Sequence, residues 1–144
     1  MKSDPLWTCP KCGHAFVSRN LWHSCARYDL DDHFRGRPPG VRRLFDRFRA
    51  MVEACGPVTM YAQKTRIVFM VRVRFASVTV RARSIRVGFW LPRLLDDPTF
   101  TVEVYGPRAY GYYRVVDDET GLDDRLQQYL REARAVGCQE HHAG

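Results

Sequence analysis

The spacing of cysteines near the start of this chain constrains its fold more than any other feature. Residues 9–13 read C-P-K-C-G, and His23 and Cys25 follow with one residue between them. Two residues between cysteines let both sulfur atoms face one point, and the following glycine permits a tight turn. Residues i and i+2 of an extended chain point to the same side. The spacing therefore predicts a Cys3His zinc site with Cys9, Cys12, His23 and Cys25 as ligands.

The fourth ligand is less constrained than the three cysteines. His14 adjoins the first cysteine pair and His33 follows the second, so both are alternatives to His23. A zinc site with four protein ligands has no open coordination position, and such a site stabilises structure and does not catalyse. Zinc is therefore expected as a structural cofactor.

The cysteine count and the first residues indicate a cytoplasmic protein. The chain has five cysteines, an odd number, and a reducing compartment disfavours disulfides. Residues 1–7 lack the apolar core of a signal peptide, and every uncharged stretch is far shorter than the roughly 20 residues of a membrane helix. We therefore expect no membrane contact.

Periodicity after residue 36 predicts an α+β domain. Apolar residues recur at steps of three and four from Val41 to Cys55, which indicates a helix, and Gly56 and Pro57 end it. A second helical stripe runs from Leu122 to Ala133, with capping-box spacing at residues 120–123 and Gly137 at its end. Between the helices, apolar residues alternate with polar ones in six segments, at residues 58–63, 66–75, 77–83, 84–91, 100–105 and 110–116.

These elements define a fold class and a domain organisation. We expect an antiparallel five- to six-stranded sheet, flanked by an N-terminal and a C-terminal helix and preceded by a small zinc-binding knuckle. The knuckle covers residues 5–28, the α+β domain residues 36–137 and a flexible tail residues 138–144. Both helices should cover the sheet face that bears Phe69, Val71, Val80, Val87 and Val102.

The middle of the chain is strongly basic. The net charge is +7, and residues 54–95 carry eight cations without one aspartate or glutamate. Alternation should place six arginines on the sheet face away from the helices: Arg66, Arg72, Arg74, Arg81, Arg83 and Arg86. Arginines side by side on a sheet repel one another, so some partner should neutralise them.

Nucleic acid is the partner that this pattern favours. Arginine grips phosphate through its planar fork, and Trp90, Tyr105 and Tyr112 would add stacking surfaces if they join that face. A solvated face neutralised by the acidic residues of the last third (Asp117, Asp118, Glu119, Asp123 and Asp124) is an alternative. A protein–protein adaptor of unknown partner is another, because zinc modules also serve as docking units.

Sequence motifs for catalysis are missing, although two groups of residues could carry chemistry. The chain has no G-x-S-x-G, H-E-x-x-H or phosphate-binding loop. Asp31 and Asp32 beside His33 could form a base or a second metal site, and Lys64 could be a functional amine. An enzyme acting on a small phosphorylated or acidic substrate therefore remains a third hypothesis, behind a binding protein.

Several separate motifs, taken in order, resemble a bacterial family of domains of unknown function, numbered 5655. The likeness rests on residues 7–13 (W-T-C-P-K-C-G), Phe16, Asn20, residues 23–25 (H-S-C), Pro38, Pro39, residues 54–58 (A-C-G-P-V) and residues 64–67 (K-T-R-I). It covers the chain from about Leu6 to Gly137. The resemblance implies an α+β fold and a bacterial cytoplasmic origin, and it favours His23 over His14 as ligand. It implies no reaction and no substrate.

Overall fold

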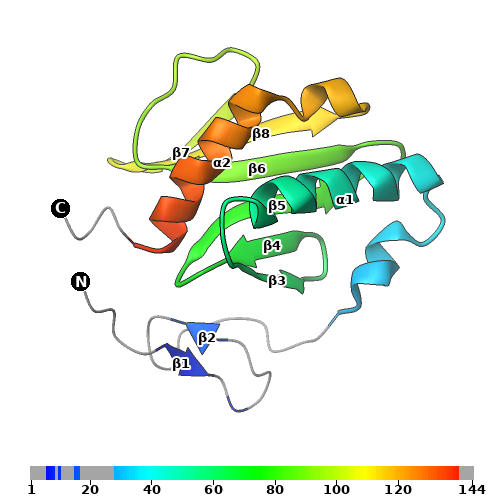
Figure 1. Cartoon of the computed structure of the whole chain (residues 1–144), viewed down its shortest axis with the longest axis horizontal. Coiled ribbons are helices and arrows are strands. Elements are labelled where there is room, and N and C mark those ends of the chain that lie inside the picture. Colours follow the sequence, from blue (N-terminus) through cyan, green and yellow to red (C-terminus); the bar gives the residue numbers. More distant parts are fainter. Residues whose placement is uncertain (1–5, 9, 11–14, 17–27, 140–144) are drawn as a thin grey trace.

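Two α-helices and a six-stranded antiparallel sheet form the body of the molecule in the part of the chain that the structure describes (Figure 1). The structure is a computed structural model and describes residues 6–8, 10, 15–16 and 28–139. The strands are β3 (Thr59–Ala62), β4 (Ile67–Met70), β5 (Arg74–Val80), β6 (Ile85–Leu91), β7 (Thr101–Gly106) and β8 (Ala109–Val116). They lie in the order β3-β4-β5-β6-β8-β7, so β3 and β7 are the edges. The α+β prediction is confirmed.

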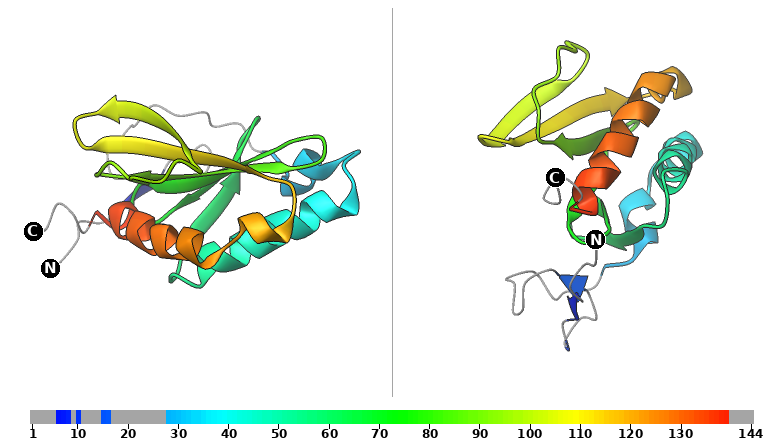
Figure 2. Two further views of the ribbon diagram at one scale, coloured as in Figure 1. Left: turned by 90° about the horizontal axis from the view of Figure 1, so that it is seen from above. Right: turned by 60° about the vertical axis from the view of Figure 1, so that its left-hand side comes forward.

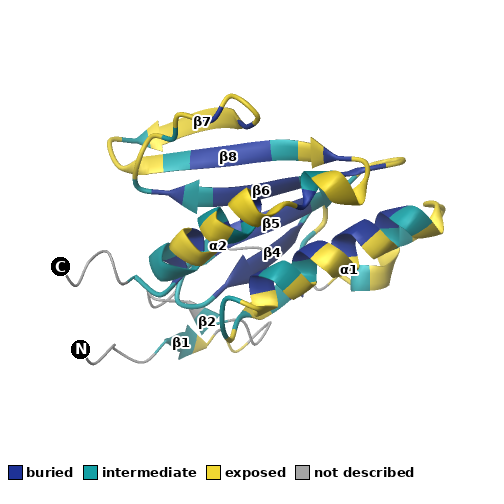
Figure 3. Ribbon diagram, turned by 45° about the horizontal axis from the view of Figure 1, so that its top comes forward, coloured by how far each residue is buried: buried dark blue, intermediate teal, exposed yellow. Residues whose placement is uncertain are grey.

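Both helices cover one face of the sheet, as predicted (Figures 2 and 3). Helix α1 (Pro39–Glu53) buries Val41, Leu44, Phe45, Phe48 and Val52, and α2 (Asp124–Gly137) buries Leu126, Leu130, Ala133 and Gly137. These side chains meet the apolar side of β4, β5, β6 and β8; the Phe48 and Phe69 rings, for example, lie 5.9 Å apart in a T-shaped arrangement. Burial of this aromatic and aliphatic layer, at about 1.5–3 kcal/mol for each large side chain, drives the helices onto the sheet. No described helix has the length and apolar character needed to cross a bilayer.

The helix ends follow from local chemistry. Pro39 is the first residue of α1, where its missing N–H costs nothing, and Gly56 (φ 140°) turns the chain after the helix. Before α2, the short 3-10 turn η2 (Glu119–Gly121) contains Thr120, and the N-cap is Asp123, whose carboxylate accepts from Leu126 N–H at 2.9 Å. The prediction of a cap at Thr120 is therefore wrong by three residues.

The predicted strand over residues 66–75 contains β4 and the first two residues of β5, separated by a turn at residues 71–73. The Gly137 carbonyl oxygen at the end of α2 accepts hydrogen bonds from the backbone N–H groups of Arg72 (2.8 Å) and Val73 (3.0 Å). A Cβ on Gly137 would lie 2.5 Å from the Phe75 ring, so only glycine lets the helix end approach this closely. The alternation of apolar and polar residues continues through this turn, so the local sequence does not reveal it. The group that stabilises the turn lies at the end of a helix far along the chain.

A short hairpin precedes the α+β body. Strand β1 (Trp7–Thr8) pairs antiparallel with β2 (Ala15–Phe16), with Thr8 opposite Ala15. The pair brackets the C-x-x-C-G segment. The predicted zinc ligands Cys9, Cys12, His23 and Cys25, and the alternative ligand His14, lie outside the described residues, as do residues 140–144 of the predicted tail.

Strand β4 is buried on both faces, although it lies next to the edge strand β3. Ile67 and Phe69 belong to the core under the helices, whereas Val68 and Met70 form a second buried cluster with Tyr61 of β3 on the opposite face. The β1–β2 hairpin lies on that side of β3 and β4 (Figures 1 and 2). The prediction that Val68 and Met70 face away from the helices is confirmed, but that part of the face is not exposed to solvent.

Candidate nucleic-acid interface

The six predicted arginines do not share one face of the sheet. Only Arg74 and Arg86 lie on strands with side chains opposite the helices. Arg66 precedes β4, Arg72 lies in the β4–β5 turn, and Arg81 and Arg83 lie in the β5–β6 turn. The prediction of a single basic face is wrong because it continued strand alternation through residues where the chain turns.

Four cations instead gather at one end of the sheet, which we call the basic end: Lys64, Arg66, Arg81 and Arg83. The β3–β4 turn and the β5–β6 turn leave the antiparallel sheet at the same end, beside the start of α1 (Figures 1 and 2). Within the described residues, none of the four forms an ion pair with a carboxylate. Arg66 donates to the neutral Gln63 side chain at 3.0 Å. In the described part of the chain, direct ion pairs therefore neutralise none of the four cations.

A cleft of about 560 Å³ lies beside the basic end. It is lined by the first residues of α1, by Arg43 and Arg83, and by the acidic residues Asp117, Asp118 and Glu119. The predicted acidic cover of the arginines is thus partly present, since three of the five acids lie near Arg83. They form no ion pair with it within the described residues, and Asp123 instead lies 3.5 Å from Arg114.

The other predicted arginines have neutral partners or a distant carboxylate. Arg74 donates to the Tyr61 hydroxyl at 2.7 Å, and Arg72 donates to the Gln139 side chain at 2.9 Å. Arg86 lies 3.9 Å from Glu103, and its guanidinium lies 4.1 Å from the centre of the Tyr113 ring. The Arg86 guanidinium therefore contacts the sheet mainly through a cation–π interaction with Tyr113.

The exposed part of the sheet face opposite the helices, which we call the open face, lies on β6, β8 and β7. Its side chains that reach solvent are Arg86, Trp90, Thr101, Glu103, Tyr105 and Val115. Of the three predicted stacking residues, Trp90 and Tyr105 are on this face. Tyr112 is not, because it is buried in the core with its hydroxyl donating to the Arg93 carbonyl oxygen at 2.8 Å.

Strand β7 extends beyond the cover of the helices. Val102, predicted as a core residue, is 43% exposed and Val104 is 67% exposed. Both lie on the helix side of an edge strand. These exposed valines favour the alternative of a protein partner.

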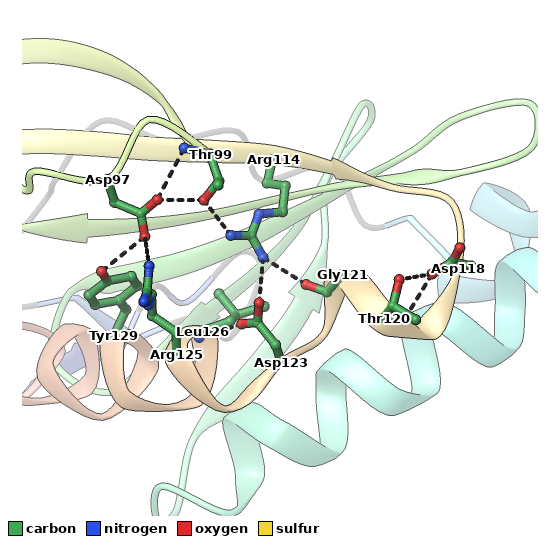
Figure 4. A network of polar contacts seen from close by, with 10 residues as sticks. All are labelled: Asp97, Thr99, Arg114, Asp118, Thr120, Gly121, Asp123, Arg125, Leu126 and Tyr129. Atoms are coloured by element: carbon green, nitrogen blue, oxygen red, sulfur yellow. Dashed lines mark hydrogen bonds and ion pairs between the residues drawn. The ribbon is translucent and has the colours of Figure 1, made fainter.

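A polar network around the buried Asp97 side chain connects the loop at residues 92–100 to α2 (Figure 4). The Asp97 carboxylate accepts hydrogen bonds from the Thr99 hydroxyl (2.6 Å), the Thr99 backbone N–H (3.0 Å) and the Tyr129 hydroxyl (3.0 Å). The hydrogen bond from the Thr99 hydroxyl is the main cause that lowers the pKa of Asp97 below its usual range. Arg114 donates to Gly121 O (2.9 Å) and to the Thr99 hydroxyl (2.6 Å), and its guanidinium lies 4.0 Å from the centre of the Phe100 ring. Each of these groups has a partner inside the protein, so the network holds structure.

The residues of the predicted catalytic group are engaged in structural contacts. Asp31 pairs with Arg42 at 2.9 Å and Asp32 pairs with Arg35. His33 lies on the 3-10 turn η1 (Leu30–Phe34), where its Nε2 donates to the Gln63 carbonyl oxygen at 2.7 Å. Among the residues that the structure describes, no three histidine, cysteine or acidic side chains gather as metal ligands.

A protein-family model matches residues 30–134, under the description "Domain of unknown function (DUF5655)". The match spans more than half of the chain. The chain belongs to the DUF5655 family. The matched region of this DUF5655 protein starts at η1 and ends within α2, so it contains the sheet, both helices and the basic end. Neither the curated proteins nor the solved structures contain a match to the chain.

Sequence reasoning missed the role of Tyr113 and of two glycines on the open face. Tyr113 lies opposite Gly88 of β6, and Gly111 lies opposite Trp90. The only signal was the alternation in Y-G-Y-Y at residues 110–113, which places Gly111 and Tyr113 on the same side of β8. It could not show which of Tyr112 and Tyr113 is buried in the core.

Proposed function

We propose that this DUF5655 protein is a zinc-containing nucleic-acid-binding protein whose basic end contacts the phosphate backbone. The observation that carries the proposal is the group of cations at that end, Lys64, Arg66, Arg81 and Arg83, without carboxylate partners among the described residues. Guanidinium groups in two turns can reach phosphates along a strand. Such contacts position the backbone and carry no sequence information.

Zinc is proposed at the Cys3His set in the N-terminal segment. The pairing of β1 with β2 supports it, because Thr8 lies opposite Ala15 and these residues flank the C-x-x-C-G sequence. Two residues between cysteines is a usual ligand spacing in structural zinc sites. The proposed role of the ion is structural, since a segment of this size buries too little apolar surface to fold alone.

The test is a binding titration with labelled single- and double-stranded oligonucleotides at low and high salt. Each neutralised phosphate releases counterions, so the affinity of the wild-type protein should fall steeply as salt rises. The variant Arg81→Glu/Arg83→Glu should weaken binding at low salt by roughly tenfold or more and lower the salt slope by about 2. Both side chains are exposed, so the fold should be unaffected.

The matched control is Arg47→Glu/Arg131→Glu. It makes the same change in net charge at exposed positions on the helices, away from the basic end. It should bind more tightly than Arg81→Glu/Arg83→Glu. Equal losses of affinity in the two variants would show that only net charge matters and would contradict a contact at the basic end. A wild-type protein that binds no oligonucleotide at low salt would refute the proposed function.

A further inference from the structure

On the open face, the rings of Tyr105 and Tyr113 pack against glycine residues. Tyr105 packs against Gly111 of β8, and Tyr113 packs against Gly88 of β6. A Cβ on Gly111 would lie 2.7 Å from Tyr105 Cε2 and 2.9 Å from the Tyr113 hydroxyl oxygen. A Cβ on Gly88 would lie 2.7 Å from Tyr113 Cδ1 and Cε1. Both rings therefore occupy space that any other residue at Gly88 or Gly111 would fill, and they pack against the sheet backbone.

The hydroxyl group of Tyr105 is held in place by two partners. It donates to the Glu103 carboxylate, so the hydrogen bond with Tyr113, at 2.6 Å, must come from the Tyr113 hydroxyl. Burial of the hydroxyl and these hydrogen bonds raise the pKa of Tyr105, which keeps the group neutral. Tyr105 as a whole is nevertheless 55% exposed. Because the hydroxyl is held by hydrogen bonds while the residue is largely exposed, we expect the ring to contribute part of the exposed surface.

The two rings differ in what covers them. The Arg86 guanidinium lies over Tyr113, 4.1 Å from the ring centre, and the Trp90 ring meets Tyr113 edge-on at 6.5 Å. Tyr113 is thereby buried, whereas Tyr105 is largely exposed and its hydroxyl is held by two hydrogen bonds. A side chain that is already ordered loses little rotational freedom when a ligand stacks on it.

Tyr105 lies near the β7–β8 turn, at the opposite end of the sheet from the basic end, and Arg86 lies between the two. Arg86 is the second residue of β6, directly after the β5–β6 turn that carries Arg81 and Arg83. Glu103 is the one carboxylate among the described side chains of the open face, and it faces Arg86 and the Tyr105 hydroxyl. A polyanion that contacts Arg81 and Arg83 can therefore continue over Arg86 to the Tyr105 ring.

We propose that Tyr105 is a stacking platform for an unpaired base, so that the preferred ligand is single-stranded nucleic acid. This inference rests on the proposed function and specifies its substrate class. Every base has an aromatic face, so stacking tolerates sequence, whereas the bases of a duplex are already stacked on one another. The phosphates then lie along Arg86 and the basic end, and the base lies on Tyr105.

The experiment measures the affinity of the full chain for a labelled oligothymidylate of about 12 nucleotides, a length within known single-strand site sizes. The comparison ligand is a duplex of equal length at the same low salt. Tyr105→Ala and Tyr105→Leu should each weaken single-strand binding on the order of tenfold, because both remove the aromatic face. Tyr105→Phe keeps the ring and should stay close to wild type. Duplex binding should change little in all three.

Val104→Ala is the matched control, since Val104 is also exposed on β7 but points to the opposite side. It should bind like wild type. If wild type binds the oligothymidylate and Tyr105→Ala binds it equally well, the stacking platform is refuted and the basic end stands. If wild type binds neither ligand, the proposed function fails and the inference fails with it.

Discussion

At the scale of single residues, Asp97 is the buried charge on which the loop at residues 92–100 depends. Its side chain is 1% exposed, and its partners come from the loop itself and from α2. Arg125 lies 3.6 Å away but is itself largely exposed. A buried carboxylate is stable only while hydrogen-bond donors surround it, so the loss of its charge should be felt in the stability of the whole domain.

We therefore predict that Asp97→Asn lowers the free energy of unfolding by about 2–3 kcal/mol, because an amide group replaces an acceptor among donors. Urea unfolding followed by circular dichroism measures this change. The exposed neighbour supplies the control, since Asp96→Asn should cost no more than about 0.5 kcal/mol. Equal effects of the two variants would show that the Asp97 network contributes nothing.

The stability of Asp97→Asn should also depend on pH differently from that of the wild-type protein. The pKa of Asp97 is lower in the folded protein than in the unfolded chain, so its contribution to stability is full above the ordinary carboxyl pKa of about 3.9. That contribution is lost as the pH falls below this value toward the folded pKa. The stability of Asp97→Asn should accordingly decline less steeply than that of wild type over this acid range.

At the scale of elements, the start of α2 depends on one carboxylate. Asp123 caps the helix through Leu126 N–H and also approaches Arg114 at 3.5 Å. We predict that Asp123→Ala lowers the free energy of unfolding by about 1 kcal/mol, the usual cost of a lost N-cap. Asp123→Asn keeps a capping oxygen and should recover most of this loss. Asp124→Ala, at an exposed position in the first turn, should have a smaller effect in the same urea titration.

The elements also show what the sequence can predict. Steps of three and four located both helices, and period-two alternation located all six strands of the sheet, since helix and sheet faces are chosen by burial. The turn at residues 71–73 could not be found in this way, because alternation continues through it and its stabilising partner, Gly137, comes from a distant helix. The cap was misplaced because Thr120 has suitable chemistry but belongs to η2.

The candidate interface was less predictable than the fold. Counting alternate positions correctly placed Arg74 and Arg86 opposite the helices, yet it assigned Arg81 and Arg83 to a strand that ends at Val80. A cation lies on the face of the sheet if its strand includes it, and at the end of the sheet if the strand stops before it. A shift of one residue in the strand boundary therefore changes the assignment. The contact between Tyr105 and Gly111 joins neighbouring strands through packing that no sequence period reports.

At the scale of the whole molecule, Tyr61, Val68 and Met70 form a second buried cluster on the sheet face opposite the helices. It lies on the side of β3 and β4 where the β1–β2 hairpin is found. If zinc holds that hairpin, removal of the ion should uncover this apolar cluster while the core under the helices stays intact. The two parts of the molecule should then respond differently to a chelator.

The prediction is that Cys12→Ser loses the single zinc equivalent measured by native mass spectrometry. It should also raise the fluorescence of a dye that binds exposed apolar surface, with little change in the helical circular dichroism signal. His33→Ala serves as the control, because its imidazole contacts Gln63, and it should retain zinc. A Cys12→Ser protein with a full equivalent of zinc would refute the assignment of the ligands.

The hydrogen bonds from Arg72 and Val73 to the Gly137 carbonyl have a consequence for biosynthesis. A ribosome releases the β4–β5 turn long before it has made the end of α2, so the turn lacks its acceptor throughout most of translation. Contacts between segments so distant along the chain form slowly. We therefore expect the β4–β5 turn to reach its final conformation only after α2 has emerged from the ribosome and formed, so this part of the sheet should become ordered late in folding.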